Sequence, residues 1–309
     1  MVPVTHPSEP TARTTPAGTA TVPTGTAVPT GPAAARPRLI ATDLDGTLLR
    51  DDKSVSARTI SALAAAEAAG IEVFFVTGRP ARWMGVVSDH VHGHGLAICA
   101  NGAAVVDLHS SGSGRHRIVE TRPLERRDAL EIVHALRAAA PGVSFAVERT
   151  GGIHYEPEYP SFPLDPGASF APADVLLTDA TGPAYTQPVL KLLAHHPTRD
   201  PDEFLALGRK VGGAHGEFTR SSHSALLEIS GRGVSKASTL ARACAERGIT
   251  AEEVVAFGDM PNDLAMLAWA GRSYAMANAH PEVLLATTGR TLTNEEDGVA
   301  TVIETFLPG

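Results

Sequence analysis

The segment 38-RLIATDLDGTLLR-50 decides how the rest of the chain is interpreted. An apolar run from Leu39 to Ala41 predicts a buried strand, and the run leads into two aspartates, Asp43 and Asp45, with one leucine between them. On extended backbone, residues i and i+2 point the same way. Both carboxylates are therefore expected to face one ligand at the end of a strand.

The residues after this segment predict alternating helices and strands. A helix capped by Ser54 or Ser56 is followed by an apolar, β-branched run, 71-IEVFFVTGR-79. A helix from Pro80 to about His90 and a strand within 96-LAICANGA-103 come next. Strand and helix in alternation are typical of right-handed βαβ units and a parallel sheet.

The C-terminal part of the chain repeats this pattern. We expect a helix over 235–249, a strand over 253-EVVAFGDM-260 and a helix over 261-PNDLAMLAWAG-271, which begins with proline. A short strand, Ser273 to Met276, and a final helix, Glu295 to Phe306, complete it.

The middle of the chain combines hairpins and helices. Hairpins are expected over 104–120 and 143–156, helices over 124–139 and from Pro201 to Val211, a Pro-rich loop over 157–174, and strands near 188–195, 215–222 and 225–230. We therefore predict an α/β protein in which a Rossmann-like parallel-sheet core, 38–103 and 233–309, carries an inserted α+β cap domain, 104–232. Residues 1–37, rich in Thr, Pro, Ala and Gly, predict a disordered tail.

Composition excludes several classes of function. The net charge of −8, without a cluster of Lys and Arg, argues against nucleic acid as a partner. No window approaches the roughly 18 consecutive apolar residues of a membrane span. Cys99 and Cys244 lie in apolar surroundings and predict buried free thiols. A cytoplasmic location fits these features.

Polar residues follow four of the predicted strands, and in a parallel sheet ligands bind beyond the carboxyl ends of the strands. These residues are Asp43 and Asp45, Thr77 to Arg79, Asn101 and Gly102, and Asp259 with Asn262 and Asp263. Four carboxylates gathered there would repel one another unless a cation lay between them. Mg²⁺ takes carboxylate oxygens together with water and phosphate, so it is the expected cofactor. Lys236 could add a positive charge opposite a phosphate.

Taken together and in order, these motifs resemble those of the haloacid dehalogenase-like hydrolases, in particular the Cof-type branch with a C2 cap. They are DLDGTL (43–48), TGR (77–79), NGA (101–103), the lysine of GVSKAS (233–238) and GDMPND (258–263). The resemblance covers nearly all of residues 38–307. Each motif falls at a predicted strand end or helix start, as its chemistry requires.

The resemblance implies a role for each motif residue. Asp43 would be the nucleophile that forms an aspartyl-phosphate, and Asp45 the general acid and then the base. Thr77 would hydrogen-bond the transferring phosphoryl group, and Lys236 would neutralise its charge.

The other motif residues would hold the metal ion and the substrate. The metal ligands would be Asp43, Asp45 through its carbonyl, Asp259 and Asp263. Substrate contacts would come from Gly46, Gly78, Arg79, Asn101 and Asn262. Asn101-Gly102 is also an ordinary turn sequence, and Arg79 could instead pair with an acidic neighbour.

The resemblance therefore implies a Mg²⁺-dependent phosphatase that acts on a small phosphorylated metabolite: a sugar phosphate, a nucleotide or a phosphorylated cofactor. The second carboxylate, Asp45, favours phosphate-ester hydrolysis or phosphomutase chemistry. The alternatives are a phosphomutase or sugar-phosphate phosphatase of a related C2-capped branch, and a phospho-ligand sensor without turnover. The 134 residues between Asn101 and Lys236 would form the cap, a lid over the site.

Several other residues permit two interpretations. His90, His92 and His94 alternate in a Gly-rich stretch, which favours a surface loop over a zinc site. Lys191 is either a cap residue that meets the phosphate or leaving group, or a solvated strand residue. Trp83 and Trp269 are expected in the core.

Overall fold

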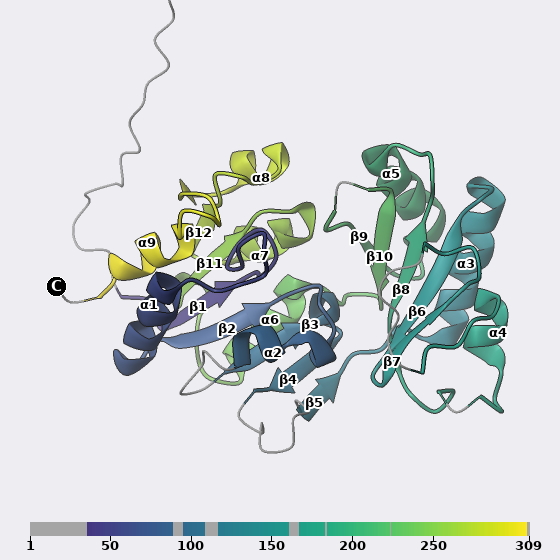
Figure 1. The fold of residues 1–309 in the computed structure, drawn as a ribbon, viewed down its shortest axis with the longest axis horizontal. Helices are drawn as coiled ribbons and strands as arrows, with labels where there is room; N and C mark the ends of the chain where they lie inside the picture. The colour runs from purple at the N-terminus through teal and green to yellow at the C-terminus, as the bar shows by residue number, and fades with distance from the viewer. Residues whose placement is uncertain are drawn as a thin grey trace, which may run out of the picture. The chain divides into compact units, whose positions relative to one another are not determined.

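The structure is a computed structural model that describes residues 36–88, 95–108, 117–160, 167–182, 184–222 and 224–307 (Figure 1). Two sheets with their helices make up this part of the chain. No helix within the described residues is long and apolar enough to cross a membrane.

The larger sheet has eight strands in the order β13-β12-β11-β1-β2-β3-β4-β5. Their bounds are β1 Leu39–Thr42, β2 Glu72–Val76, β3 Leu96–Cys99, β4 Ala104–Asp107, β5 Arg117–Thr121, β11 Val254–Gly258, β12 Arg272–Ala275 and β13 Gly289–Arg290. The central strand, β1, pairs in parallel with both β11 and β2. Because it is covered on both faces, β1 has no polar alternation and is buried throughout.

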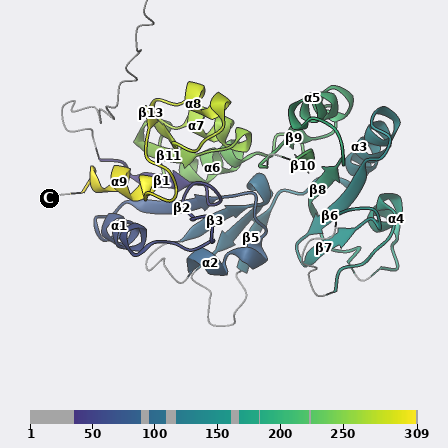
Figure 2. The ribbon, with the colours of Figure 1, turned by 45° about the horizontal axis from the view of Figure 1, so that its top comes forward.

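Helices cover both faces of this sheet, and apolar side chains of the helices and strands form one continuous core. The helices are α1 Ala57–Ala68, α2 Gly85–Ser88, α6 Lys236–Ala245, α7 Leu264–Trp269, α8 Pro281–Ala286 and α9 Gly298–Glu304, with 3₁₀ turns at η1 Ala81–Trp83, η2 Ala100–Gly102, η4 Ala251–Glu253 and η5 Pro261–Asp263. Helix α1 packs against α9, and α6 packs against α7. In Figure 2, α6, α7 and α8 lie on the opposite side of the sheet from α1 and α2. The predicted parallel-sheet α/β core is confirmed.

The smaller sheet has five antiparallel strands in the order β7-β6-β8-β10-β9. Its strands are β6 Ser144–Arg149, β7 Gly152–Tyr155, β8 Val189–His195, β9 Glu217–Thr219 and β10 Leu226–Ser230. Helices α3 Arg126–Ala139, α4 Ala173–Thr178 and α5 Pro201–Gly212 share a hydrophobic core with one face of this sheet. The other face carries a separate small apolar cluster to which no residue of a described helix belongs.

The chain passes between the two sheets twice, and the two connections lie side by side. A Cβ atom added to Gly231 would lie 2.6 Å from the carbonyl oxygen of Pro123. The inserted segment is therefore attached to the core by two chain connections that lie next to each other.

The structure differs from the sequence-based expectations at several elements. The hairpin expected over 104–120 forms as β4 and β5, but it extends the larger sheet from β3 instead of starting the inserted segment. The main-chain turn at Ala100 and Asn101, both with positive φ, sends β4 back alongside β3. The sheets therefore divide beyond Thr121, not at residue 103.

Short elements account for the remaining differences. The helix expected from Pro80 to His90 is reduced, within the described residues, to η1 and α2. Helices α4 and α8 and strand β13 were not predicted, because they have at most six residues and little periodicity. The expected tail up to residue 35, and His90, His92 and His94, lie outside the described residues.

Gly102 provides a test of the close packing between η2 and α6. Gly102 has φ of +102°, and an added Cβ would lie 2.3 Å from the carbonyl oxygen of Ser235. We expect Gly102→Ala to lower the free energy of unfolding by about 3 kcal/mol or more, because backbone strain and a clash add together. Urea denaturation measures the change.

Gly70→Ala is the matched control. Gly70 also has positive φ, +78°, but nothing lies within 4 Å of an added Cβ. This variant should cost only about 1–2 kcal/mol. An equal loss in both variants would contradict the predicted clash at Gly102.

Candidate active site

The predicted site residues meet at the carboxyl edge of the larger sheet. Strands β11, β1, β2 and β3 are consecutive neighbours, and they run parallel. Asp259, Asp43 and Thr77 directly follow the first three, and Asn101 follows β3 by two residues. Residues separated by more than 200 positions in sequence are thus brought to one edge.

Three buried carboxylates form the centre of the site. One oxygen from each of Asp43, Asp259 and Asp263 lies within 4.8 Å of the others. The ammonium group of Lys236 donates to Asp43 at 2.5 Å and to Asp263 at 2.6 Å. One lysine therefore faces three carboxylates, and the cluster carries excess negative charge.

The start of helix α6 holds Lys236 in this position. The side chain of Ser235 accepts from the backbone N–H of Ser238, and the Ser238 hydroxyl accepts from the backbone N–H of Ser235. This capping box makes Lys236 the first helical residue, with a side chain only 1% exposed. Burial acts to lower the pKa of Lys236, but Asp263 and Asp43 outweigh it, so the pKa is raised and the lysine stays charged.

The cluster has room for one more positive charge. Burial, and then the charges of Asp263 and Asp259, raise the pKa of Asp43 well above its usual value, although Lys236 opposes them. Burial and the charge of Asp263 raise the pKa of Asp259 to about 7. Carboxylates that resist ionisation in this way favour either a proton or a bound cation, so the cluster fits a metal ion.

The three carboxylates differ in how many oxygens remain available. Asp263 accepts from Lys236 with Oδ1 and from the backbone N–H groups of Asp259 and Met260 with Oδ2. Among the described residues, the Asp259 side chain accepts a hydrogen bond only from the hydroxyl of Thr47, at 2.8 Å. Asp259 and Asp43 are thus better placed than Asp263 to ligate a metal directly.

Gly46 allows the loop after β1 to approach the cluster. It has φ of +77°, and an added Cβ would lie 2.3 Å from Oδ2 of Asp259. The amide of Asn278 donates to the Gly46 carbonyl at 2.8 Å and fixes the loop from the other side. Only glycine fits here, for both steric and conformational reasons.

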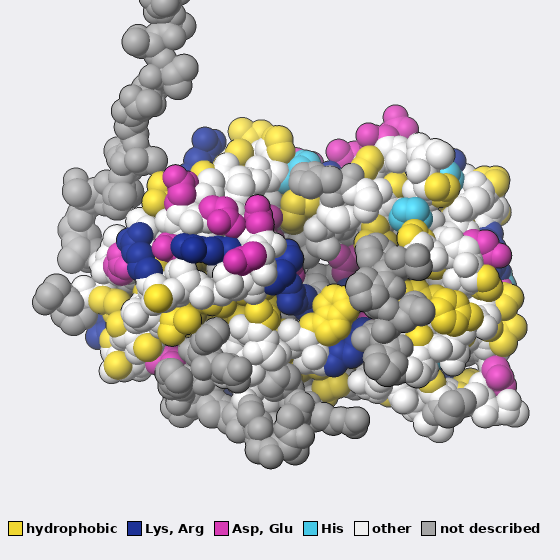
Figure 3. Space-filling view, viewed as in Figure 1, with side chains coloured by type: hydrophobic (Ala, Val, Ile, Leu, Met, Phe, Trp, Pro, Cys, Tyr) yellow, Lys and Arg dark blue, Asp and Glu magenta, His cyan; other side chains and the backbone are white. Residues whose placement is uncertain are grey.

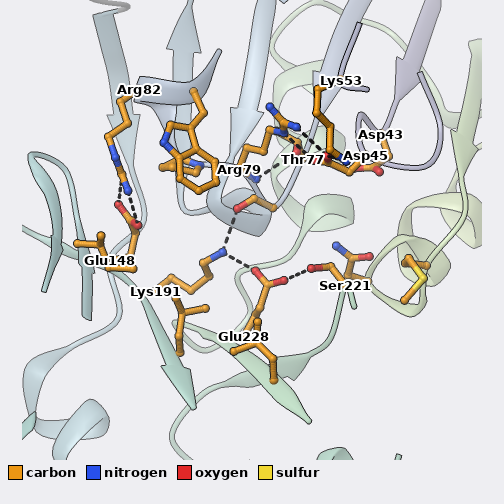
Figure 4. Close-up of a pocket in the computed structure, with 18 of the residues that line it drawn as sticks. Asp43, Asp45, Lys53, Thr77, Arg79, Arg82, Glu148, Lys191, Ser221 and Glu228 are labelled. Atoms are coloured by element: carbon orange, nitrogen blue, oxygen red, sulfur yellow. Dashed lines mark hydrogen bonds and ion pairs between the residues drawn. The ribbon is translucent and has the colours of Figure 1, made fainter. Parts of the chain in front are cut away.

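The carboxylate of Asp45 lies apart from this cluster, so three carboxylates gather here and not the four that the sequence predicted. Arg79 donates to both of its oxygens, at 2.6 and 2.7 Å, and Lys53 lies 3.0 Å away (Figure 4). Burial acts to raise the pKa of Asp45, but the hydrogen bonds and charges of Arg79 and Lys53 outweigh burial and lower it. Arg79 thus pairs with an acidic neighbour in this structure, which is the alternative to a substrate contact that the sequence left open.

The TGR motif lies between Asp45 and the inserted segment. The Thr77 hydroxyl, buried at the end of β2, accepts from the backbone N–H of Arg79 at 3.1 Å. The carbonyl of Gly78 accepts from Lys191 of β8 at 2.9 Å. This motif therefore contacts both sheets.

Asn101 and Asn262 join the core to the second sheet. The amide of Asn262 donates to Asn101 at 3.2 Å, and the amide of Asn101 donates to Glu228 of β10 at 2.9 Å. Oδ1 of Asn262 is buried and has no hydrogen-bond partner within the part of the chain that the structure describes. An acceptor in that state can receive a hydrogen bond from a ligand.

Acidic residues of the inserted segment also contact the core, and they were not predicted from the sequence. Glu228 binds Lys191, Ser221 and Asn101, and Glu148 binds Arg82 of η1 (Figure 4). Lys191 and Glu228 are almost fully buried, so a solvated position for Lys191 is wrong. A charge within an apolar strand, as Glu228 in 225-ALLEIS-230, was the available signal.

A cavity of about 480 Å³ opens from the carboxyl edge of the larger sheet toward the smaller sheet. Figure 3 shows basic, acidic and hydrophobic side chains around the hollow where the two parts meet. Trp83 lines this cavity and is 50% exposed, so its predicted core position is wrong, because η1 is a single turn with no buried stripe. Trp269 packs against the core, and Cys99 and Cys244 are buried free thiols, as predicted.

Comparison with known proteins identifies the family. A model of the haloacid dehalogenase-like hydrolases matches residues 40–303. The chain is 28% identical over 280 residues to the 5-amino-6-(5-phospho-D-ribitylamino)uracil phosphatase YitU of Bacillus subtilis, covering 88% of this chain and 98% of the relative. It is 29% identical over 259 residues to the pyridoxal phosphate phosphatase YbhA of Escherichia coli, covering 80% and 90%.

The fold agrees with solved structures of the same family. A haloacid dehalogenase-like hydrolase from B. subtilis superposes with a TM-score of 0.70 at 27% identity, covering 86% of this chain and 99% of that one. The chain belongs to the haloacid dehalogenase-like hydrolase family. The predicted family and the predicted class of enzyme, a hydrolase acting on phosphoric monoesters, are confirmed.

The raised pKa values predict that metal binding stabilises the fold in a pH-dependent way. The folded-state pKa of Asp259, about 7, exceeds its ordinary value of 3.8, so the stability of the metal-free protein falls as pH rises between these values. A cation competes with that proton. We expect millimolar Mg²⁺ to raise Tm by about 3–6 °C near pH 8 and by about 1 °C or less near pH 5.

Thermal unfolding with Mg²⁺ and with EDTA measures this effect. Asp259→Asn should remove most of the Mg²⁺-dependent rise near pH 8. An equal rise at both pH values, or a rise that persists in Asp259→Asn, would contradict the assignment of the cluster as a metal site.

The pair formed by Lys191 and Glu228 predicts a charge-dependent loss of stability. Lys191→Met leaves the Glu228 carboxylate buried without its counter-ion, which should lower the free energy of unfolding by about 3–5 kcal/mol near pH 7. At present burial raises the pKa of Glu228, but Lys191 and the hydrogen bonds outweigh burial and lower it. Without Lys191 that pKa should rise, so the loss should shrink as pH falls toward about 5.

The double variant Lys191→Met/Glu228→Gln is the control. It removes both charges, so it should recover about half or more of the lost stability near pH 7. If urea denaturation gave the same stability for the single and double variants, the loss would come from packing and not from an unpaired charge.

Proposed function

We propose that this protein hydrolyses a small phosphate monoester with Mg²⁺ through an aspartyl-phosphate on Asp43. The observation that carries the proposal is the position of Asp43. Its carboxylate lines the cavity, lies 2.5 Å from Lys236, and belongs to the cluster that fits a metal ion. One place in the structure thus combines a carboxylate that could act as nucleophile, a cation that could neutralise phosphate charge, and space for an ester.

In the first step an oxygen of Asp43 attacks phosphorus while the bond from phosphorus to the leaving oxygen breaks. Asp45, which also lines the cavity, gives its proton to that leaving oxygen. Arg79 and Lys53 lower the pKa of this carboxyl, so they must release it before it can carry a proton. An incoming ester that draws these cations to its own phosphate would do so.

In the second step water attacks phosphorus, Asp45 takes a proton from the water, and the bond between phosphorus and Asp43 breaks to release phosphate. The low pKa of Asp45 in the structure suits this half of the cycle. Lys236 stays charged throughout and limits repulsion between Asp43 and the phosphate oxygens.

The metal ion would be held by Asp43, Asp259 and the carbonyl of Asp45, with Asp263 placed to orient Lys236 and the backbone after β11. When bound, Mg²⁺ would neutralise phosphate charge and polarise the phosphorus–oxygen bond. Buried carboxylate oxygens are the donor set that Mg²⁺ prefers, and no described cysteine or histidine belongs to the cluster.

The other predicted site residues would bind the phosphate. Thr77 would donate its hydroxyl, and Gly46 and Gly78 would offer backbone N–H groups. Asn262 would orient the phosphate, and its unpartnered oxygen would accept from the ester or from water. Asn101 would act through Asn262 and Glu228 as a positioning residue.

We further propose that the inserted segment is a lid. The hairpin β4 and β5 stays with the core, and the lid begins after Thr121 and ends near Gly231. Contacts from Lys191, Glu228 and Glu148 to the core close the cavity on that side. Opening these few contacts about the paired connections would admit substrate.

The substrate would be a small phosphorylated metabolite. Two relatives act, by name, on pyridoxal phosphate and on a ribitylaminouracil phosphate. Both are monoesters with a single phosphate, which agrees with one phosphate-binding point in the cavity.

Phosphate release from a panel of phosphate esters tests the proposal. We expect turnover that requires Mg²⁺ and stops with EDTA. Asp43→Asn should lower kcat by about 10³-fold or more, and Asp45→Asn by about 10²–10⁴-fold. Thermal unfolding should show that both variants remain folded.

Asp179→Asn, at an exposed turn of the inserted segment, is the matched control and should leave kcat unchanged. Turnover that survives in Asp43→Asn would overturn the nucleophile. Transfer of phosphate to a second hydroxyl in preference to water, with activation by a bisphosphate, would favour a phosphomutase. Binding without turnover of any ester would favour a sensor.

A further inference from the structure

The face of the smaller sheet that is turned toward the catalytic edge has an apolar strip. Tyr155, Ala146 and Leu193 are direct neighbours on β7, β6 and β8. With Ile153 and Tyr159 they form a hydrophobic cluster separate from the helix-covered core. The cavity is lined by Ile153, Tyr155, Tyr159, Leu193 and Leu226, so the strip faces the space where an ester must lie.

Charged residues separate this strip from the core. Glu148 lies opposite Lys191 on neighbouring strands, and Glu228 lies opposite Leu193. They bind Arg82, the Gly78 carbonyl and Asn101, respectively, all of them on the core side. The strip therefore begins where these contacts end. The leaving group of an ester bound at Asp43 would extend past the charged residues and contact the apolar side chains of the strip.

Trp83 adds an aromatic surface from the core side of the same cavity. Its ring lies 5.4 Å from the guanidinium carbon of Arg82, whose partner is Glu148 on the neighbouring strand of the strip. Half of the Trp83 side chain is exposed. Large exposed aromatic groups beside a binding cavity commonly contact ligand.

The charges that line the cavity are already paired. Among the described residues, Arg79 and Lys53 bind Asp45, Arg82 binds Glu148 and Lys191 binds Glu228. If the ion pairs of Asp45 opened, Arg79 and Lys53 could bind one phosphate. A second anionic group near the strip would break a buried pair, so the distal part of the ligand is expected to be neutral.

We propose that the leaving group is an alcohol that carries a neutral, flat heteroaromatic ring, and that this ring lies between Trp83 and the strip of Tyr155 and Leu193. This inference rests on the proposed phosphatase function and narrows its substrate class. Hydroxyl-rich sugars would lose hydrogen bonds to water against the hydrocarbon of the strip. A cavity of about 480 Å³ has room for a ligand with one to three rings.

Matched esters of primary alcohols test the proposal. Flavin mononucleotide and pyridoxine 5′-phosphate carry heteroaromatic ring systems, whereas glucose 6-phosphate and glycerol 3-phosphate carry the same phosphate without an aromatic ring. We expect kcat/KM to be about tenfold or more higher for the aromatic pair. Trp83→Ala should lower kcat/KM about fivefold to tenfold for the aromatic esters and leave the other two unchanged.

Leu285→Ala is the matched control, because Leu285 is an exposed hydrophobic residue of α8 that does not line the cavity. It should change neither class of ester. Equal or better turnover of the two non-aromatic esters, or an equal loss for all four esters in Trp83→Ala, would overturn the inference while the phosphatase function stands.

A binding measurement separates this inference from the phosphatase function. Flavin mononucleotide added to Asp43→Asn with Mg²⁺ should lose fluorescence as its ring stacks, and Trp83→Ala in the same background should restore most of it. Quenching that depends on Trp83, but without turnover in the wild type, would support the ring site and overturn the phosphatase. Quenching unaffected by Trp83→Ala, or no quenching, would overturn the ring site.

Discussion

The contact of one buried lysine with two aspartates holds the catalytic edge together. Lys236 joins Asp43, at the end of β1, to Asp263, beside β11, at distances of 2.5 and 2.6 Å. A buried ion pair of this kind contributes little net stability, because desolvation offsets most of the attraction. It does decide which arrangement is allowed, since removing either partner leaves an uncompensated charge in the interior.

The remaining charge of the cluster then determines its chemistry. Asp43, Asp259 and Asp263 outnumber Lys236, so the pKa values of Asp43 and Asp259 are raised. A bound metal ion would relieve this repulsion and could in turn bind a phosphate. The proposed nucleophile, metal site and phosphate site would all follow from this one electrostatic imbalance.

A second set of charges closes one side of the cavity. Glu228, Lys191 and Glu148 are buried or nearly so and bind the core loops directly. Because they are satisfied by one another and by the core, they close one side of the cavity without attracting a second anion. In the proposed function, the apolar strip beyond them would contact the part of the substrate that distinguishes one phosphate ester from another.

Sequence reasoning predicted much of the core and its site. Asp43, Thr77, Asn101 and Asp259 could be assigned to one edge, because parallel strands end together and each residue follows an apolar run. It placed the sheet division too early, at 103, because hairpin residues look alike whether they extend one sheet or begin another. Helix α4 was missed because six residues give too little periodicity.

The chain by itself thus determined the local signals: strand periodicity, the capping serine before Lys236, and the glycine that Asp259 requires at position 46. Only the tertiary structure decided which charges meet. Arg79 with Asp45, Lys191 with Glu228 and Arg82 with Glu148 come from separate elements, and no spacing in sequence encodes a distance between them. Pairing across space depends on how the two sheets pack, and so does the exposure of Trp83 in the cavity.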